Sequence, residues 1–231
     1  MPLRNTVLFP QQLIPIYIGR ERSLKLINEL ESKKRYIVVV AQEDGSIEDP
    51  KPKDLYSFGT LAQVLKVFDM PDNSKSAIVQ GISRVKILDY TQTNPYFTAA
   101  VESMEDEPIE DSVEVEALST NLRQAFEDLM KVAPNLTEEH SGMLKNIQKP
   151  NRLTDRAISV ITISNQEKQE ILEELNIKQR MEKALNLISR EMQRIKLGEE
   201  IQTEVHDEIS KTQREYYLRE QMKAIKKELG E

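Results

Sequence analysis

The C-terminal part of the chain most constrains the fold, because it predicts one helix too long to be buried by the rest of the sequence. Asn176 is a suitable N-cap, and the helical pattern continues from there to Leu229. At about 1.5 Å per residue, an unbroken helix would be roughly 80 Å long. Gly198 is its weakest position and a candidate hinge, while a basic last turn before Gly230 predicts that the helix ends there, near the end of the chain.

Apolar residues recur along this helix about every three or four residues, which places them in seams on its surface. The first seam is Met181, Leu185, Ile188, Met192 and Ile195; the second is Ile201, Val205, Ile209, Thr212 and Tyr216; the third, out of phase, is Leu218, Met222, Ile225 and Leu229. This stripe is too long to be buried against the short helices before it. We therefore predict a partner in another domain or another chain. The candidate contact residues are Tyr216, Tyr217, Leu218 and Met222.

The first part of the chain is rich in predicted strands. Apolar and β-branched runs predict them over Leu3–Phe9, Ile14–Ile18, Tyr36–Ala41, Thr60–Phe68, Ser76–Gln80, Ile82–Leu88 and Tyr96–Val101. Gly81 lies between two of these runs and predicts a bulge or bend, and one helix is expected over Arg20–Lys33. Short strands with one helix among them indicate a small, partly closed β-barrel.

An acidic stretch from Glu102 to Glu116 separates the strands from a helical region. Helices are predicted over Val113–Lys131, Thr137–Ile147 and Thr154–Ile163, and a further helix should begin after Ser164, which forms a capping-box pattern with Glu167. The predicted fold class is α+β. Its parts are a β-rich domain over 1–103, an acidic linker over 104–116, a helical bundle over 117–176 and the long, coiled-coil-like helix over 177–231.

Charge and cysteine content limit what this chain can bind and where it can work. Its net charge is −7, whereas a nucleic-acid binder usually carries a basic face, so nucleic acid is not an expected partner. Cysteine is absent, which excludes thiol catalysis and disulfides and agrees with a cytoplasmic protein. No apolar run reaches the roughly 20 residues of a membrane span. The N-terminus is not a signal peptide, because the apolar region of such a peptide does not follow Arg4. The strand pattern begins at once, so the start looks truncated.

A search for catalytic motifs gives specific negatives. None of the seven glycines is followed by lysine, which excludes a phosphate-binding P-loop, and no two are spaced as in a nucleophile elbow. His140 and His206 lie far apart and fit no zinc pattern. Acidic pairs such as Glu199–Glu200 fall on exposed helix, where nothing would shift a pKa for acid–base catalysis. We expect no catalytic residue, no metal ligand and no cofactor in this chain.

Two groups of residues are candidates for binding other proteins. The apolar group lies near predicted turns and strand edges, where most members should be core but a minority could form an exposed adhesive patch: Leu8, Phe9, Leu13, Ile14 and Met70. The polar group lies at the exposed start of the first helix: Glu21, Arg22 and Lys25.

Several stretches carry a resemblance to one known family. They are residues 2–10 (PLRNTVLFP), Gly19–Ser23, Val39–Gln42, residues 54–62, Val79–Arg84 and residues 210–230 (SKTQREYYLREQMKAIKKELG). Through them the chain resembles the N-terminal region of the ATP-dependent Lon proteases over essentially its whole length. Stand-alone Lon-type substrate domains and cereblon-type receptors share the earlier stretches, whereas Tyr216–Gln221 is specific to the protease.

The resemblance implies a PUA-like β-barrel, then a helical bundle and a long helix. It also implies that the parent protein carries an AAA+ ATPase module, which uses ATP and Mg²⁺, and a protease module with a serine–lysine dyad. This chain would then be no enzyme by itself. Family members form hexamers and degrade unfolded or damaged proteins in protein quality control. The implied role is therefore substrate recognition and hexamer assembly.

Two other functions remain open. The chain could be a purely structural arm that orders the hexamer and captures no substrate, which a pull-down of unfolded protein would distinguish. It could also bind RNA through its PUA-like fold, although this rests on analogy between folds and the sequence shows no basic stripe.

Overall fold

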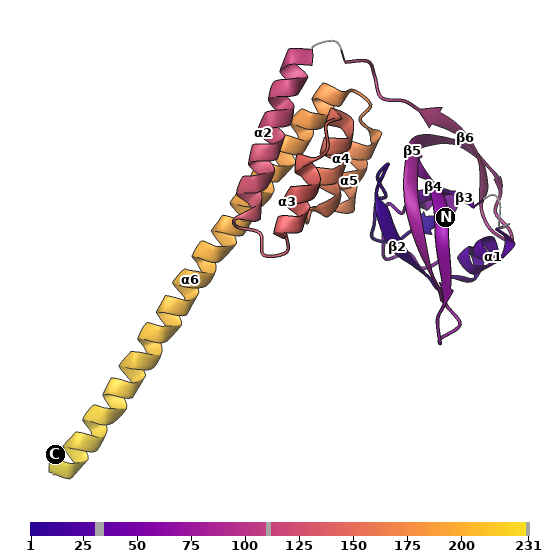
Figure 1. Cartoon of the computed structure of the whole chain (residues 1–231). Coiled ribbons are helices and arrows are strands. Elements are labelled where there is room, and N and C mark those ends of the chain that lie inside the picture. The colour runs from indigo at the N-terminus through magenta and orange to yellow at the C-terminus, as the bar shows by residue number, and fades with distance from the viewer. Residues whose placement is uncertain (31–34, 110–111, 230–231) are drawn as a thin grey trace.

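The computed structural model describes residues 1–30, 35–109 and 112–229, and these form a curved sheet, a cluster of helices and one projecting helix (Figure 1). The predicted end of the first helix at Lys33 and the predicted end of the long helix at Gly230 lie outside the described residues. The short helices lie between the sheet and the projecting helix, so the sheet and the C-terminus are at opposite ends of the molecule (Figure 1).

In the part of the chain that the structure describes, the sheet has six strands, and the long β5 pairs with three of the others. The strands are β1 (Pro2–Leu3), β2 (Leu13–Ile18), β3 (Tyr36–Ala41), β4 (Phe58–Asp69), β5 (Lys75–Gln92) and β6 (Thr98–Met104). Their order is β1-β3-β4-β5-β2, and β6 also pairs with β5. One edge of β5 pairs with β4, while its other edge pairs first with β2 and then with β6. Among the described strands, the β1–β3 pair alone is parallel.

The predicted closed, PUA-like barrel is not confirmed. Among the described residues no ladder joins β1 to β2 or to β6, so the sheet is open. The strand predicted over Leu3–Phe9 is wrong beyond Leu3, because β1 has only two residues. The chain then leaves the sheet, and Val7, Leu8 and Phe9 turn inward and are buried without ladder partners.

The absence of a side chain at Gly81 allows residues 9–12 to cross close to β5. A Cβ atom at Gly81 would lie 2.2 Å from the Phe9 carbonyl oxygen, which no side chain tolerates. The Gly81 amide donates to the Gln12 carbonyl, and the Gln11 amide donates to the Gly81 carbonyl, both at 2.9 Å. Leu61 pairs with Ser83 and Ala62 with Gly81, so Ile82 is an extra residue, and the predicted bulge is confirmed.

Helix α1 (Glu21–Glu29) covers one side of the sheet. It is shorter than predicted, because Leu30 already has an extended conformation. Its apolar side packs into a core formed with the inward face of the sheet. Fully buried members of that core include Ile18, Ile27, Val39, Val64 and Val79. Every second side chain of β2, β4 and β5 faces this core, since alternate side chains of a strand lie on the same side of the sheet.

Five helices follow the sheet within residues 112–229. They are α2 (Ser112–Met130), α3 (Glu138–Lys145), α4 (Pro150–Val160), α5 (Asn165–Glu173) and α6 (Ile177–Leu229). The capping box of Ser164 and Glu167 is confirmed at the start of α5. Asn176 caps α6 as predicted, and its Oδ1 accepts from the Gln179 amide at 3.1 Å.

Helix α6 changes character along its length. Met181 and Ile188 of the first predicted seam are fully buried in the core of the bundle, as is Ala184. The other members of that seam, Leu185, Met192 and Ile195, are partly buried against this core. Every described side chain from Lys196 to Ile225 is exposed. The helix runs without interruption through Gly198, where an added Cβ would meet nothing within 4 Å. The second seam, and Leu218, Met222 and Ile225 of the third, are therefore not buried by any other described part of the chain.

A buried network of ion pairs fastens the sheet to the helices. Arg84 of β5 donates to both carboxylate oxygens of Asp155 of α4, at 2.9 and 2.6 Å, and its Nε donates to the Leu172 carbonyl at 2.8 Å. Arg180 of α6 is fully buried and pairs with Asp106, which follows β6. The two guanidinium groups balance the two carboxylates, so the interface stays neutral. The sheet and the bundle are thereby held in one orientation.

Candidate functional site

The structure removes Leu8 and Phe9 from the candidate binding surface. Leu8 is buried in the core of the sheet and Phe9 in the core of the helical bundle. Adjacent side chains point in opposite directions, and here each direction leads into a different core. An unfolded protein cannot reach either residue, so their prediction as capture residues is corrected.

The other apolar candidates differ in exposure. Leu13 is 53% exposed at the start of β2, and Met70 is 41% exposed just after β4. Ile14 is half-buried, because it faces the core of the sheet. Leu13 and Met70 are thus available to solvent, and Ile14 is largely a core residue.

Leu13 belongs to a larger apolar surface on the outside of the sheet, which we call the outer face. In the ladders, Pro15 of β2 pairs with Ile78 of β5, and Tyr17 pairs with Ser76, which pairs in turn with Phe68 of β4. Residues that pair directly lie on the same side of a sheet. The outer face therefore comprises Leu13, Pro15, Tyr17, Phe68 and Ile78, with Met70 in the adjoining turn.

Two contacts order the outer face. The Tyr17 hydroxyl donates to Asp72 at 2.8 Å, which connects β2 to the turn between β4 and β5. The Lys66 ammonium lies 4.8 Å from the centre of the Phe68 ring. The sequence did not single out Tyr17 or Phe68, although β2 (LIPIYI) is apolar on both of its faces, which is the signal that could have revealed this surface.

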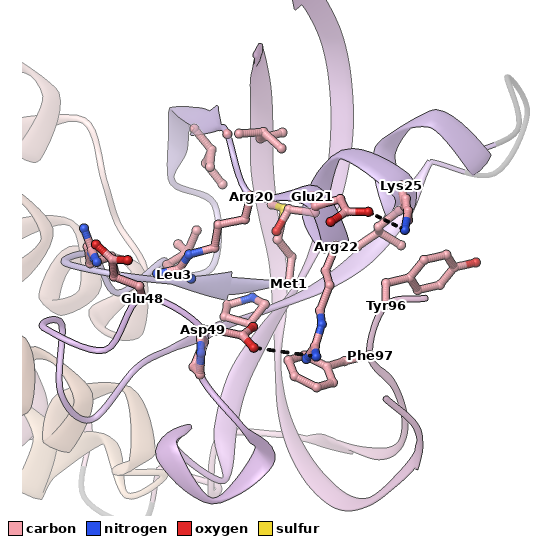
Figure 2. A pocket seen from close by; sticks show the side chains of 18 of the residues that line it. Met1, Leu3, Arg20, Glu21, Arg22, Lys25, Glu48, Asp49, Tyr96 and Phe97 are labelled. Carbon is pink, nitrogen blue, oxygen red and sulfur yellow. Dashed lines mark ion pairs between the residues drawn. The ribbon is translucent and has the colours of Figure 1, made fainter. Parts of the chain in front are cut away.

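A groove of about 1140 Å³ opens beside the start of α1 (Figure 2). It lies between β1, the end of β2, the start of α1 and the loop before β6. The predicted polar residues all line it: Glu21, Arg22 and Lys25. Sequence reasoning missed the other side of the groove, which comes from residues 48–50 and 94–97, far away in the chain.

Ion pairs and one aromatic contact fix the walls of the groove. Arg22 pairs with Asp49 at 3.7 Å and lies over the ring of Phe97, 5.3 Å from its centre (Figure 2). Lys25 pairs with Glu21 at 2.7 Å, and this hydrogen bond lowers the pKa of the exposed Glu21 carboxyl. The charges of Arg22, Glu21 and Lys25 are thus already engaged within the wall.

Arg20 is a further cation at the groove that the sequence did not identify. Its Nη2 donates to Gln42 Oε1 at 2.6 Å. Burial and the nearby charge of Arg4 lower the pKa of Arg20, and the carboxylates of Asp49 and Glu48 oppose that shift. Arg4 and Arg20 both line the groove, so their charges face the same space.

The predicted contact residues of α6 lie in its projecting half. Tyr216 is 68% exposed and Leu218 is 51% exposed, and Tyr217 and Met222 are similarly open to solvent. Gln221 donates to the Tyr217 hydroxyl at 2.9 Å, one turn away. The projecting half of α6 points away from the sheet (Figure 1), so the surface on it is separate from the outer face and the groove.

Within the part of the chain that the structure describes, no three His, Cys, Asp or Glu residues gather as metal ligands would. None of the described helices combines the length and the apolar character needed to span a membrane.

Comparisons with known proteins agree on one family. The family model of the ATP-dependent protease La (LON) substrate-binding domain matches residues 1–190. The Lon protease of Koribacter versatilis is 43% identical over the whole chain, and that of Dictyoglomus thermophilum is 40% identical over the whole chain. The chain spans only 28% and 29% of the length of these relatives.

Two solved structures share the fold. The N-terminal domain of Lon protease from Mycobacterium avium complex has a TM-score of 0.62 at 20% identity, covering 82% of this chain and 96% of that one. The Lon N-terminal domain protein from Xanthomonas campestris has a TM-score of 0.57 at 16% identity, covering 80% of this chain and 95% of that one. The chain therefore belongs to the family of ATP-dependent protease La (LON) substrate-binding domains.

Proposed function

We propose that this chain recognises unfolded or damaged proteins for a Lon-type ATP-dependent protease, and that the outer face is where they bind. The observation that carries this proposal is the exposed apolar surface of Leu13, Tyr17, Phe68 and Met70 on one side of the sheet. Unfolded proteins differ from folded ones by the apolar side chains they expose. A surface that buries such side chains distinguishes the two without reading a particular sequence.

Such binding is weak at each site and depends on repetition. Burial of apolar area contributes about 25 cal/mol per Å², and much of this is offset by the ordering of a flexible segment. If several copies of the chain are held together, a long unfolded chain can contact more than one outer face, and effective affinity rises. Capture by the outer face therefore fits a subunit of an assembly.

The test measures binding of the whole 231-residue chain to a permanently unfolded protein, reduced and carboxymethylated lactalbumin. We expect Phe68→Ser with Leu13→Ser to weaken binding about tenfold or more, because each change removes roughly 1–2 kcal/mol of apolar contact. The matched control is Leu88→Ser, which alters an equally apolar side chain that is 60% exposed outside this face. Equal losses in both variants, or none in the double variant, would refute the outer face as the capture site.

We further propose that the projecting half of α6 mediates assembly of subunits into a hexamer. Leu218 follows Tyr216 by two residues, which is about 200° around a helix of 3.6 residues per turn. The apolar stripe thus changes sides near residue 217, and the helix can contact different neighbours above and below this point. Sedimentation equilibrium at high protein concentration should detect self-association that Leu218→Glu with Met222→Glu abolishes. Strictly monomeric behaviour of the parent chain would contradict assembly through α6 alone.

A purely structural arm remains the alternative function, because the exposed stripe on α6 would suit assembly equally well without any capture of substrate. The lactalbumin experiment separates the two: a structural arm predicts no binding of the unfolded protein by this chain.

A further inference from the structure

Two strands at the ends of the sheet each leave one edge unpaired, and both edges reach the same groove. In the part of the chain that the structure describes, β1 pairs with β3 alone and β2 pairs with β5 alone. Residues 1–4 and residues 16–19 both line the groove beside α1. The groove therefore lies in the gap between β1 and β2, where the sheet stays open.

The main chain of β1 has one acceptor and one donor that point away from β3. The carbonyls of Met1 and Leu3 accept hydrogen bonds from amides of β3 and of the residue after it, at 3.1 and 2.9 Å. The C=O and N–H of a trans peptide point in opposite directions, so the Arg4 N–H points away from β3. The Pro2 carbonyl does so too, since successive residues of a strand alternate in direction. Outside the β1–β3 ladder, no described residue bonds to either group.

The main chain of Tyr17 faces the free edge of β2. Residues of an antiparallel strand bond alternately to one neighbour and to the other. The Gln12 carbonyl accepts from the Gly81 amide of β5, so residues 14, 16 and 18 also bond to β5. Pro15, which has no N–H, falls on the other side, as expected of a proline in an edge strand. The N–H and C=O of Tyr17 point the same way as Pro15, and outside the β2–β5 ladder no described residue bonds to them.

One inserted strand would satisfy both edges. A strand parallel to β1 donates to the carbonyl of one residue and accepts from the amide two residues later, which is the spacing of Pro2 and Arg4. A strand antiparallel to β2 exchanges both hydrogen bonds with a single residue, which Tyr17 offers. β1 is parallel to β3, and the pairs β3–β4, β4–β5 and β5–β2 are antiparallel, so β1 and β2 run in opposite directions. The same inserted strand is thus parallel to β1 and antiparallel to β2.

The groove has room for such a strand. A strand advances about 3.3 Å per residue, lies about 4.8 Å from its neighbours and is about 10 Å thick with its side chains, which is roughly 160 Å³ per residue. The groove, of about 1140 Å³, thus admits a segment of about seven residues. Side chains of a strand alternate between the two faces of a sheet, so every second one would face the interior.

An inner cavity of about 240 Å³ adjoins the groove on its interior side. The two spaces share the lining residues Met1, Pro2, Leu26, Tyr96 and Phe97. The other walls of the cavity are mostly apolar, with Ile37, Val40 and Leu55 among them. An apolar protein cavity of about 150 Å³ accommodates benzene, so this one has room for an apolar side chain of the inserted segment.

We propose that an extended segment of an unfolded protein binds in the groove as an added strand, parallel to β1 and antiparallel to β2. Its main chain bonds to the Pro2 carbonyl, the Arg4 amide and both groups of Tyr17, and one apolar side chain enters the inner cavity. A folded protein has already paired its main-chain groups, whereas an unfolded one offers them. This inference rests on the proposed recognition of unfolded protein. It adds a second site that reads the main chain, while the outer face binds apolar side chains.

The test uses the acetylated, amidated heptapeptide Lys-Val-Ser-Val-Glu-Val-Lys, whose apolar side chains alternate. Two further forms carry an N-methyl group on the central residue, or on both residues beside it, so that each form lacks donors toward one edge. Binding to the 231-residue chain is measured by calorimetry. We expect each methylated form to bind about threefold to tenfold more weakly, as the loss of a neutral hydrogen bond implies. By NMR, hydrogen exchange of the Arg4 and Tyr17 amides should slow when the unmethylated peptide is bound.

Substitutions at Arg4 separate its main chain from its side chain. Arg4→Pro removes the N–H that points into the groove and should weaken binding of the unmethylated peptide about threefold to tenfold. Arg4→Ala is the matched control, because it removes the charge but keeps the N–H, and it should bind as the parent does. The melting temperature of each variant shows whether it is folded. Where Arg4→Pro does not fold, the methylated peptides and the amide exchange of the parent decide the question. Leu13→Ser with Phe68→Ser, on the outer face, should leave peptide binding unchanged.

The inference is overturned if the heptapeptide does not bind, if the methylated forms bind as well as it does, or if a folded Arg4→Pro variant binds like Arg4→Ala. Unchanged exchange of the Arg4 and Tyr17 amides in the bound state would also overturn it. Loss of peptide binding in the outer-face double variant would do the same, while supporting the proposed function. Conversely, lactalbumin binding that ignores the outer-face variants would refute that surface and leave the peptide results standing on their own.

Discussion

Arg180 and Arg84 are among the most buried charged residues that the structure describes, with side chains 0% and 4% exposed. Transfer of a guanidinium out of water costs several kcal/mol, which is recovered only if opposite charge and hydrogen bonds are supplied in good geometry. Asp155 and Asp106 supply the opposite charge, one from each side of the junction between bundle and sheet. They also accept hydrogen bonds from both arginines, although Nη1 of Arg180 forms none and lies 3.7 Å from Asp155. Substitutions at these four residues therefore test how the sheet and the helical bundle are held together.

Asp155→Ala removes a carboxylate that contacts both arginines. We expect a loss of about 3–5 kcal/mol in the free energy of unfolding, because buried Arg84 loses its bidentate carboxylate and buried Arg180 keeps only Asp106. Urea denaturation measures this loss. Asp128→Ala is the control: it deletes an exposed ion pair with Lys131, and the change should stay within about 0.5 kcal/mol. A loss below about 1 kcal/mol for Asp155→Ala would show that the network is not buried in solution.

The charge of Asp106 should make the fold acid-sensitive. Burial alone would raise the pKa of Asp106, but hydrogen bonds from Arg180 and Asn151 and the charge of Arg84 outweigh it and hold the pKa below its ordinary value of 3.8. A carboxyl whose pKa is lowered by folding stabilises the fold above the ordinary pKa, and this contribution is lost as pH falls through the lower, folded value. Urea denaturation at pH values from 7 to 3 should show a smaller decline in the free energy of unfolding for Asp106→Asn than for the parent. Identical pH profiles would contradict this assignment.

Among the elements, α6 combines two environments in 53 residues. Its first turns are held by the bundle, whereas its projecting half depends on helix propensity and on local pairs such as Glu215–Arg219 at 3.9 Å. The predicted strands and helices mostly appear where the periodicity placed them, and β3 (Tyr36–Ala41) does so residue for residue. Periodicity did not reveal that β5 continues through Gly81 as one strand.

Gly198→Ala tests whether the glycine serves as a hinge. The helix is regular there and the new methyl group would meet no atom within 4 Å, so we expect stabilisation of the local helix by about 1 kcal/mol. Hydrogen exchange of amides near residue 198 should slow accordingly. Distances between spin labels at positions 186 and 210 should keep the same mean, with an equal or narrower distribution. A shifted mean distance would indicate a bend at Gly198 in the parent.

On the scale of the whole molecule, sheet and bundle are one structural unit joined at residues 8–9 and at the arginine network. The Leu8 carbonyl accepts from Thr60 Oγ1 at 2.5 Å inside the sheet, while the next side chain, Phe9, is fully buried among the helices. Phe9 thus belongs to the bundle core although it lies near the start of the sheet region. The domain boundaries at residues 103 and 116 stay predictions. Hydrogen bonds join residues on either side of them, from Arg84 to Leu172 and from Arg180 to Asp106.

Phe9→Ala should weaken this joint. We expect a loss of about 3–5 kcal/mol in the free energy of unfolding, as for other buried phenylalanines. We also expect the parent to unfold in one calorimetric transition and the variant in two, one for the bundle and one for the sheet. Val101→Ala is a control of similar chemistry on an exposed strand position, and it should leave one transition. Two transitions in the parent chain would show that the sheet and the bundle unfold independently.

The sequence by itself determined the element types, the capping of α5 and α6, the excess length of α6 and the family. These follow from local periodicity, from hydrogen bonds between near neighbours and from stretches of matching residues. Only the tertiary structure decided which apolar residues are accessible, since Leu8 and Leu13 look alike in sequence but lie in the core and on the outer face. It also brought residues 20, 49 and 97 to one groove, and Arg84 to Asp155, because long-range contacts depend on how the sheet curves and stays open at β1.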